Sequence, residues 1–209
     1  MIIDVSKYQG YIDWGLVAPN VDAAIIKATG EETAGPVPFR DARFLGNWNA
    51  ARSENVTIGA YHFMDGGRGS ATGKAEAEFF LRALDFVGGA RPGDIVPTLD
   101  VEWPPRSGRE FQIDQLGEAV EFLRSRLGKF PMIYTGRWYW DQIIDASDFD
   151  ELIPCPLWIA SYSSNPPAPP QPWSKISLWQ YTNRASVPGI SGYVDANKLL
   201  EASLSDLIL

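Results

Sequence analysis

The chain has 209 residues, and its 18 basic and 26 acidic side chains give a formal net charge of −8. That balance argues against a nucleic-acid binder that tracks phosphates, because such a protein needs a basic stripe. With 45% hydrophobic residues, the chain is long enough to bury a core as one domain. Cys155 is the only cysteine and His62 the only histidine, which excludes an intramolecular disulfide, a thiolate metal cluster and a histidine-rich zinc site.

Eight short apolar runs separated by turn signals are predicted to be strands. Apolar residues occupy both the odd and the even positions of these runs. This pattern is typical of strands that are covered on both faces of a parallel sheet. The predicted strands are residues 2–5, 23–28, 57–63, 95–101, 131–135, 157–160, 176–181 and 193–195. Between the early runs, helical periodicity predicts helices over residues 38–55, 75–87 and 111–127, and Gly128 follows the third at a C-cap position.

Strands that alternate with helices indicate βαβ units. Five prolines between residues 163 and 174 exclude a helix there, and residues 183–192 are too few for a full crossover helix. We therefore predict a single α/β domain over residues 1–209, an irregular TIM-like barrel of eight strands with helices missing in its C-terminal part. A last helix is predicted over residues 197–202. An open doubly wound sheet fits the first five strands equally well.

Polar side chains gather where the predicted strands end, which is where the active site of a β/α barrel lies. They are Asp4, Lys27, Tyr61, His62, Asp100, Glu102, Tyr134, Tyr162, Gln180 and Asp195. Aromatic residues fall at or just after the same ends, namely Trp103, Trp138, Tyr139, Trp140, Tyr162 and Trp179. Aromatic faces beside a few polar groups are typical of sugar-binding clefts, so we expect one or two of these rings to be exposed there.

The pair Asp100 and Glu102 is the sharpest chemical signal. Because side chains alternate along a strand, both point to the face that Thr98 shares, while Leu99 and Val101 face the helices. Two carboxylates ~6.5–7 Å apart raise one pKa, so that one group donates a proton while the other stays ionised. Glycoside hydrolysis needs this combination. A solvated acidic strand end and half of a cation site are the alternatives.

Asp4 and Asp195 add two more carboxylates on the first and last predicted strands, which are neighbours in a closed barrel. They could face each other across the mouth, or bond to loop backbone. Four carboxylates could also hold magnesium or calcium, but Lys27 would compete with the cation, and we expect no metal and no cofactor. Lys27 is read as a partner of the carboxylates rather than a Schiff-base nucleophile. His62 is either a hydrogen-bonded core residue or a site residue.

Short motifs in order along nearly the whole chain resemble the Chalaropsis-type lysozymes, glycoside hydrolase family 25. They are DVS at 4–6, QG at 9–10, IDW at 12–14, IKAT at 26–29, GAYHF at 59–63, LDVE at 99–102, IYT at 133–135, LWIA at 157–160 with Tyr162, WQYT at 179–182 and VDAN at 194–197. None is specific alone, but the ordered series is.

The resemblance implies a muramidase that cleaves the β-1,4 bond between N-acetylmuramic acid and N-acetylglucosamine in peptidoglycan. It implies that Glu102 is the general acid/base and that Asp100 is a second carboxylate, either a nucleophile or a support for the substrate's 2-acetamido group. Asp4 and Asp195 match the other cleft carboxylates. Substrate contacts are expected from Tyr61, His62, Lys27, Tyr134, Trp158, Tyr162, Gln180 and Trp179. The expected Asp100–Glu102 separation exceeds the ~5–5.5 Å of a direct two-carboxylate retaining enzyme, so we favour substrate assistance over inversion.

The expected partner is the glycan strand of bacterial peptidoglycan, and we expect a monomer that binds neither nucleic acid nor membrane. No run reaches the ~18–20 apolar residues of a membrane span, and no basic n-region of a signal peptide precedes Asp4. Action on the cell wall would then follow release from a host cytoplasm, as for a phage lysin, or export by another route. No separate wall-binding module is visible. A non-catalytic sugar-binding barrel and a chitinase-like glycosidase are the alternatives; the latter carries an aspartate where this chain has Thr98.

Overall fold

Eight strands form a closed barrel in the order β1-β9-β8-β7-β6-β5-β4-β2, and β1 also pairs with β2. The structure is a computed structural model and describes residues 1–30, 39–64, 72–102, 109–143 and 150–209. A two-residue strand, β3 (Phe39–Arg40), extends the sheet beside β2. The barrel strands are β1 (Ile2–Val5), β2 (Ala23–Gly30), β4 (Thr57–Phe63), β5 (Thr98–Asp100), β6 (Met132–Gly136), β7 (Leu157–Ala160), β8 (Leu178–Ala185) and β9 (Val194–Leu199).

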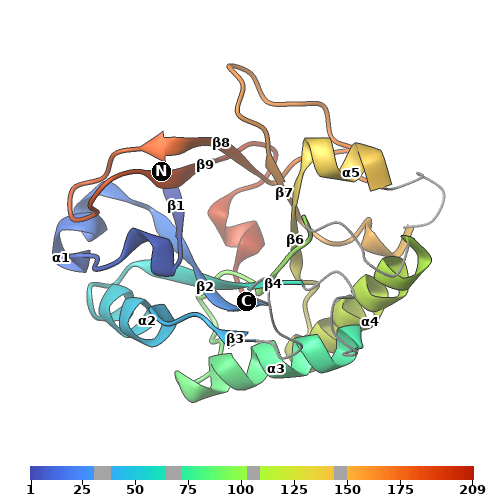
Figure 1. The fold of residues 1–209 in the computed structure, drawn as a ribbon, viewed down its shortest axis with the longest axis horizontal. Coiled ribbons are helices and arrows are strands. Elements are labelled where there is room, and N and C mark those ends of the chain that lie inside the picture. Colours follow the sequence, from blue (N-terminus) through green and yellow to red (C-terminus); the bar gives the residue numbers. More distant parts are fainter. Residues whose placement is uncertain (31–38, 65–71, 103–108, 144–149) are drawn as a thin grey trace.

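The described α-helices all lie before residue 144. They are α1 (Trp14–Val17), α2 (Phe44–Ser53), α3 (Gly73–Phe86), α4 (Arg109–Leu127) and α5 (Arg137–Ile143). Later described residues add only the 3-10 turns η3 (Asp150–Leu152) and η4 (Leu204–Leu207), while η1 (Lys7–Gln9) and η2 (Ala18–Asn20) lie near the start. In Figure 1, α2, α3 and α4 lie along the lower side of the barrel, away from β8 and β9. No described helix is long and apolar enough to cross a membrane.

The predicted eight-stranded barrel with few late helices is confirmed, and the β1–β2 and β1–β9 pairs exclude an open sheet. The predicted C-cap is also confirmed, since Gly128 has φ +72° and its N–H donates to the carbonyl of Arg124 at 2.9 Å. The helix predicted over residues 197–202 is wrong. Residues 194–199 form β9, which runs antiparallel to both β8 and β1 because a short hairpin connects it to β8.

Alternate residues of the strands divide between two apolar clusters. One cluster fills the barrel, with Ile25, Val96 and Met132 among its members, and no α-helix contributes to it. The larger cluster joins Leu99 and Val101 to helix side chains. The predicted outward orientation of Leu99 and Val101 is thus confirmed, and alternation turns Asp100 toward the barrel axis. The packing of β5 therefore decides which way its carboxylates face.

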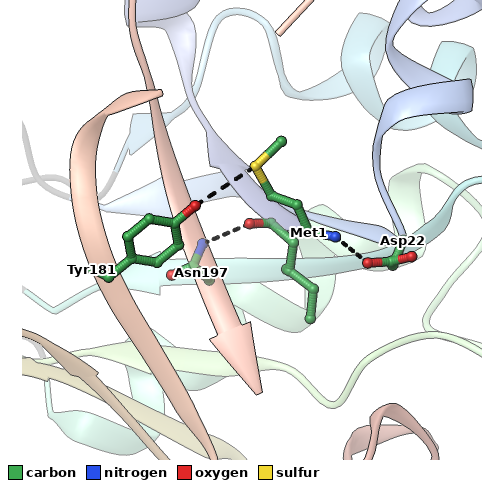
Figure 2. Close-up of polar contacts among 5 residues, drawn as sticks. Met1, Asp22, Tyr181 and Asn197 are labelled. Carbon is green, nitrogen blue, oxygen red and sulfur yellow. Dashed lines mark hydrogen bonds and ion pairs between the residues drawn. The ribbon is translucent and has the colours of Figure 1, made fainter. Parts of the chain in front are cut away.

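The first strand lies at the seam of the barrel, where β1 pairs with the last strand, β9. Contacts to both of its neighbours, β2 and β9, hold it there. The amino group of Met1 pairs with Asp22, which precedes β2, and the Asn197 amide of β9 donates to the Ile2 carbonyl at 3.3 Å (Figure 2). Figure 2 also shows the Tyr181 hydroxyl beside the Met1 sulfur, at 4.0 Å. These contacts fix the height of β1 relative to β2 and β9, and with it the position of the next polar side chain along the strand.

Candidate active site

A cavity of about 210 Å³ opens at the mouth of the barrel. Seven of the eight barrel strands, or the residues just after them, line it with Asp4, Tyr61, Asp100, Glu102, Tyr134, Trp158, Tyr162, Gln180 and Asp195. All four carboxylates singled out from the sequence therefore meet in one place. Because β9 is antiparallel, its beginning lies at the mouth, and Asp195 reaches the cavity from its second residue. Larger hollows between α3 and α4 and beside α2 contain none of these four groups.

Asp4 and Asp195 face each other directly across the pairing of β1 with β9. Burial, and then repulsion from Asp195, raises the pKa of Asp4 to about 8, although hydrogen bonds from Asn197 Nδ2 at 2.8 Å and Gln180 Nε2 at 3.0 Å oppose the rise. Burial raises the pKa of Asp195 to about 6. Near pH 7 the pair therefore carries about one negative charge, with the proton on Asp4.

Asp100 ends β5 with only 5% of its surface exposed, and Glu102 follows it half-buried. Burial raises the pKa of both groups, and for Asp100 repulsion from Glu102 adds to the effect. Two carboxylates in one buried site oppose each other's ionisation, so protons are held there more tightly than on free carboxyl groups. The Oδ1 atom of Asp100 is buried and finds no hydrogen-bond partner among the described residues. An acceptor left in this state is open to a donor on a bound ligand.

Lys27 supplies a positive charge close to this pair. It lies on β2 in register with Tyr61, and its ammonium is 4.6 Å from the ring centre of Phe63 and 5.7 Å from that of Tyr61. Burial lowers the pKa of Lys27, and nearby carboxylates, Asp100 foremost, oppose the change. The same positive charge opposes the rise in the pKa of Asp100. Lys27 does not line the cavity, so its place is that of a partner of the carboxylates.

Gln180 orders the polar groups on the opposite wall. Its Oε1 atom accepts hydrogen bonds from the hydroxyls of Tyr134 at 3.1 Å and Tyr162 at 2.9 Å, and its Nε2 atom donates to Asp4. Burial raises the pKa of both tyrosines, to well above the usual value for Tyr134. Both hydroxyls therefore stay neutral donors across the physiological range.

Asn197 is a site residue that the sequence analysis did not single out. Its Nδ2 atom donates to Asp4 and to the Ile2 carbonyl, and its Oδ1 atom accepts from the Trp158 indole at 2.7 Å. The signal was present, because Asn197 lies two residues after Asp195 in the VDAN motif and so shares its face of the strand. Once β9 is known to be a strand rather than a helix, that shared face identifies it.

His62 lies away from the cavity, which corrects the expectation that it contacts substrate. It is 1% exposed, with Nδ1 2.8 Å from the Thr29 hydroxyl and Nε2 3.0 Å from Glu76 of α3. Its neighbour Tyr61 faces the mouth, so alternation turns His62 toward the helices. The structure thus matches the core alternative, in which the ring joins β2 and β4 to α3.

Trp179 also lies outside the cavity, contrary to the expectation that it contacts substrate. It packs in the cluster shared with the helices, and its indole donates to the Ser161 carbonyl at 2.8 Å. Its neighbour Gln180 takes the inward position on β8. Of the other aromatic residues expected at strand ends, Trp138 and Tyr162 are exposed and Tyr139 and Trp140 are buried, while Trp103 lies outside the described residues.

A barrel mouth with two carboxylates at the end of one strand, a second acidic pair opposite and neutral tyrosine hydroxyls is the arrangement of a glycoside hydrolase. In the described part of the chain, no group of three or more His, Cys, Asp or Glu side chains is placed to hold a metal ion. The arrangement can transfer protons to and from a sugar oxygen and stabilise positive charge at a neighbouring carbon.

The chain belongs to glycosyl hydrolases family 25, whose family model matches residues 3–190. It is 32% identical over 202 residues to the uncharacterised protein YegX of Escherichia coli, covering 93% of this chain and 67% of that one. It is 29% identical over 204 residues to lysozyme M1 of Streptomyces globisporus, covering 94% and 66%. It thus spans about two thirds of the length of these relatives.

The fold agrees with that of a solved bacterial lysozyme from Streptomyces coelicolor, with a TM-score of 0.82 and 26% identity over 98% of this chain and 93% of that one. The resemblance noted in the sequence, the barrel and the assignment as a glycoside hydrolase are therefore confirmed.

Proposed function

We propose that the protein is a muramidase that hydrolyses the β-1,4 bond between N-acetylmuramic acid and N-acetylglucosamine in the glycan strands of bacterial peptidoglycan. The observation that carries the proposal is the meeting of Asp100 and Glu102 with Asp4 and Asp195 in one cavity of a family 25 barrel. Lysozymes among its relatives and structural neighbours support this choice of substrate over chitin. The expected protein is a monomer that acts at the cell wall without a cofactor.

Glu102 is the general acid in this proposal. It is the more exposed member of the carboxylate pair, so it is accessible to the glycosidic oxygen, and burial raises its pKa toward the pH at which it must hold a proton. It protonates the leaving oxygen as the bond to the anomeric carbon breaks. In the second half of the reaction it takes a proton from the attacking water.

Asp100 supports the substrate's own acetamido group as the nucleophile. Its buried, unpartnered Oδ1 atom accepts a hydrogen bond from the acetamido N–H, and the acetamido oxygen then forms a bond to the anomeric carbon. Water opens the resulting ring and the product keeps the configuration of the substrate. This route explains why Asp100 Oδ1 can be buried without a partner among the described residues, because the acetamido N–H of the substrate supplies its hydrogen bond. The charge shared by Asp4 and Asp195 stabilises the positive anomeric centre.

Digestion of purified peptidoglycan, borodeuteride reduction of new ends and mass spectrometry test the reaction. We expect deuterium-labelled muramitol from the wild-type protein and at least a hundredfold less from Glu102→Gln, because the general acid is lost. Glu78→Gln, on exposed α3 surface, is the matched control and should retain wild-type activity. Labelled glucosaminitol would instead indicate a glucosaminidase, and absence of new ends on several wall types would favour a non-catalytic sugar-binding barrel.

The stereochemical course tests the part assigned to Asp100. An NMR time course that resolves anomers should show the retained β-anomer first. The inverted anomer as the first product would rule out substrate assistance and assign a water molecule to the attack. Chitin should be cleaved more slowly than peptidoglycan, and the opposite ranking would favour a chitinase-like enzyme.

A further inference from the structure

Exposed aromatic rings are concentrated at the barrel mouth. Six aromatic side chains of the described residues are exposed, at 56–80% of their surface: Tyr8, Tyr11, Phe86, Trp138, Tyr162 and Tyr193. All but Phe86, the last residue of α3, lie on segments that follow or precede the mouth ends of strands. Tyr162 lines the catalytic cavity, but the other four mouth rings lie outside it and take no part in the reaction above. An exposed apolar set gathered on one face marks a binding surface.

Barrel order places the outlying rings at opposite ends of one line. Tyr8 and Tyr11 follow β1, and Trp138 follows β6. Three strands separate β1 from β6 in one direction (β9, β8 and β7), and three separate them in the other (β2, β4 and β5). In a ring of eight, these two strands are diametrically opposed. Asp4 of β1 and Tyr134 of β6 both line the cavity, so the cavity lies on the line that joins the two aromatic ends.

The segment that carries Tyr8 is held firmly although the ring itself is exposed. The Ser6 backbone N–H donates to the Gln9 side chain at 2.9 Å, within a capping box that fixes η1. The Lys7 backbone N–H donates at 2.9 Å to the buried carboxylate of Asp41. Exposure of Tyr8 is therefore imposed by a rigid backbone, and stacking a ligand on it costs little further ordering.

The other two rings are fixed in a similar way. Tyr11 precedes Ile12, which bridges to Ile190 in the hairpin before β9. Trp138 lies against Gly136, where a Cβ atom would stand 2.6 Å from the indole nitrogen. A glycine at this position thus lets the indole lie close over the end of β6. Rigid, exposed rings beside a polar cavity are suited to the apolar faces of sugar rings.

We propose that the glycan strand lies across the barrel mouth along the line from β1 to β6, with one sugar on Trp138 and another, beyond the opposite end of the cavity, on Tyr8 and Tyr11. The inference rests on the proposed function and adds two binding positions outside the catalytic cavity. It follows that long glycan strands are better substrates than short oligosaccharides, since only a long strand reaches both aromatic ends.

End-labelled oligomers of alternating N-acetylglucosamine and N-acetylmuramic acid, in a series of lengths, test this arrangement. The proteins compared are the wild type, Trp138→Ala, the double variant Tyr8→Ala/Tyr11→Ala, and the control Phe86→Ala, which removes an exposed ring outside the mouth. For the first two variants we expect the loss in kcat/KM to grow with oligomer length, reaching about three- to tenfold. The control should match the wild type at every length.

The position of cleavage gives a second, sharper readout. Because the two aromatic sites bind opposite ends of the strand, Trp138→Ala and Tyr8→Ala/Tyr11→Ala should shift the cleavage of one labelled oligomer in opposite directions. Equal losses at all lengths, or cleavage maps that both match the wild type, would overturn the proposed path of the strand while leaving muramidase activity intact. No cleavage of any oligomer or of whole peptidoglycan by the wild type would overturn the proposed function, and this inference with it.

Discussion

Lys27 sets the charge balance of the Asp100–Glu102 pair, because its ammonium opposes the rise in both carboxylate pKa values. Replacing it with methionine should raise both pKa values further. Both limbs of the profile of kcat/KM against pH should then move to higher pH, and Lys27→Arg should restore much of the wild-type profile. Lys74→Met, which removes an exposed lysine on α3, serves as the control. Unmoved limbs in Lys27→Met would show that the charge does not act on the pair.

The buried Asp4 makes stability depend on pH in a direction that can be checked. Between its ordinary pKa of 3.8 and its folded value of about 8, the folded protein holds a proton that the unfolded chain releases. The free energy of unfolding should therefore fall as pH rises through this window. Asp4→Asn keeps an acceptor for Gln180 and Asn197 but cannot ionise. In urea unfolding at several pH values, it should show a flatter dependence and exceed the wild-type stability above pH 8.

Sequence reasoning placed the four carboxylates correctly at the mouth but misplaced His62. Alternation predicts that neighbours such as Tyr61 and His62 face opposite ways, yet it does not say which faces inward. Both are polar and aromatic, so composition does not decide either. The deciding fact is the buried carboxylate of Glu76 on α3, 3.0 Å from the imidazole, and that contact exists only once the helix packs on β4.

At the scale of elements, the contact of α3 with α4 depends on a glycine at the start of α3. A Cβ atom at Gly73 would come within 1.7 Å of the Gln115 backbone oxygen of α4. Gly73→Ala should therefore push the helices apart and cost about 1–3 kcal/mol in the free energy of unfolding. The matched control is Gly46→Ala in exposed α2, where nothing lies within 4 Å and the change should stabilise by about 0.5–1 kcal/mol. Denaturant unfolding of both variants separates the effect of the clash with the Gln115 backbone from the general effect of replacing a helical glycine by alanine.

The elements themselves were predictable where an apolar run was bounded by turns. Residues 57–63 and 157–160 form strands with the predicted limits. Residues 197–202 were predicted as a helix, and the side chains of Lys198 and Leu199–Glu201 do favour one locally. Pairing of β9 along both of its edges outweighs that preference, since each ladder adds hydrogen bonds that a helix would give up. The short connection over residues 183–192 could have indicated an antiparallel last strand, but the pairing of β9 with β1, almost the whole chain away, leaves no mark in the local pattern.

At the scale of the molecule, Asn197 joins three barrel strands through hydrogen bonds to Ile2, Asp4 and Trp158. Asn197→Ala leaves the indole of Trp158 without its acceptor and removes a donor from Asp4. We expect a loss of about 1–3 kcal/mol in the free energy of unfolding, together with reduced hydrolysis because Asp4 loses its support. Asn183→Ala, at an exposed position on β8, should change neither quantity. A wild-type unfolding curve for Asn197→Ala would contradict this role at the seam.

The pairing of the first barrel strand with the last has a consequence for biosynthesis. Asp4 is synthesised before its partner Asn197, which lies 193 residues later in the chain. One edge of β1 therefore waits unpaired until β9 has emerged, and contacts so distant in sequence form late. A nascent chain that lacks β9 has neither Asp195 nor the support of Asp4. The four carboxylates of the cavity can therefore meet only after the last strand has been synthesised and has docked beside the first.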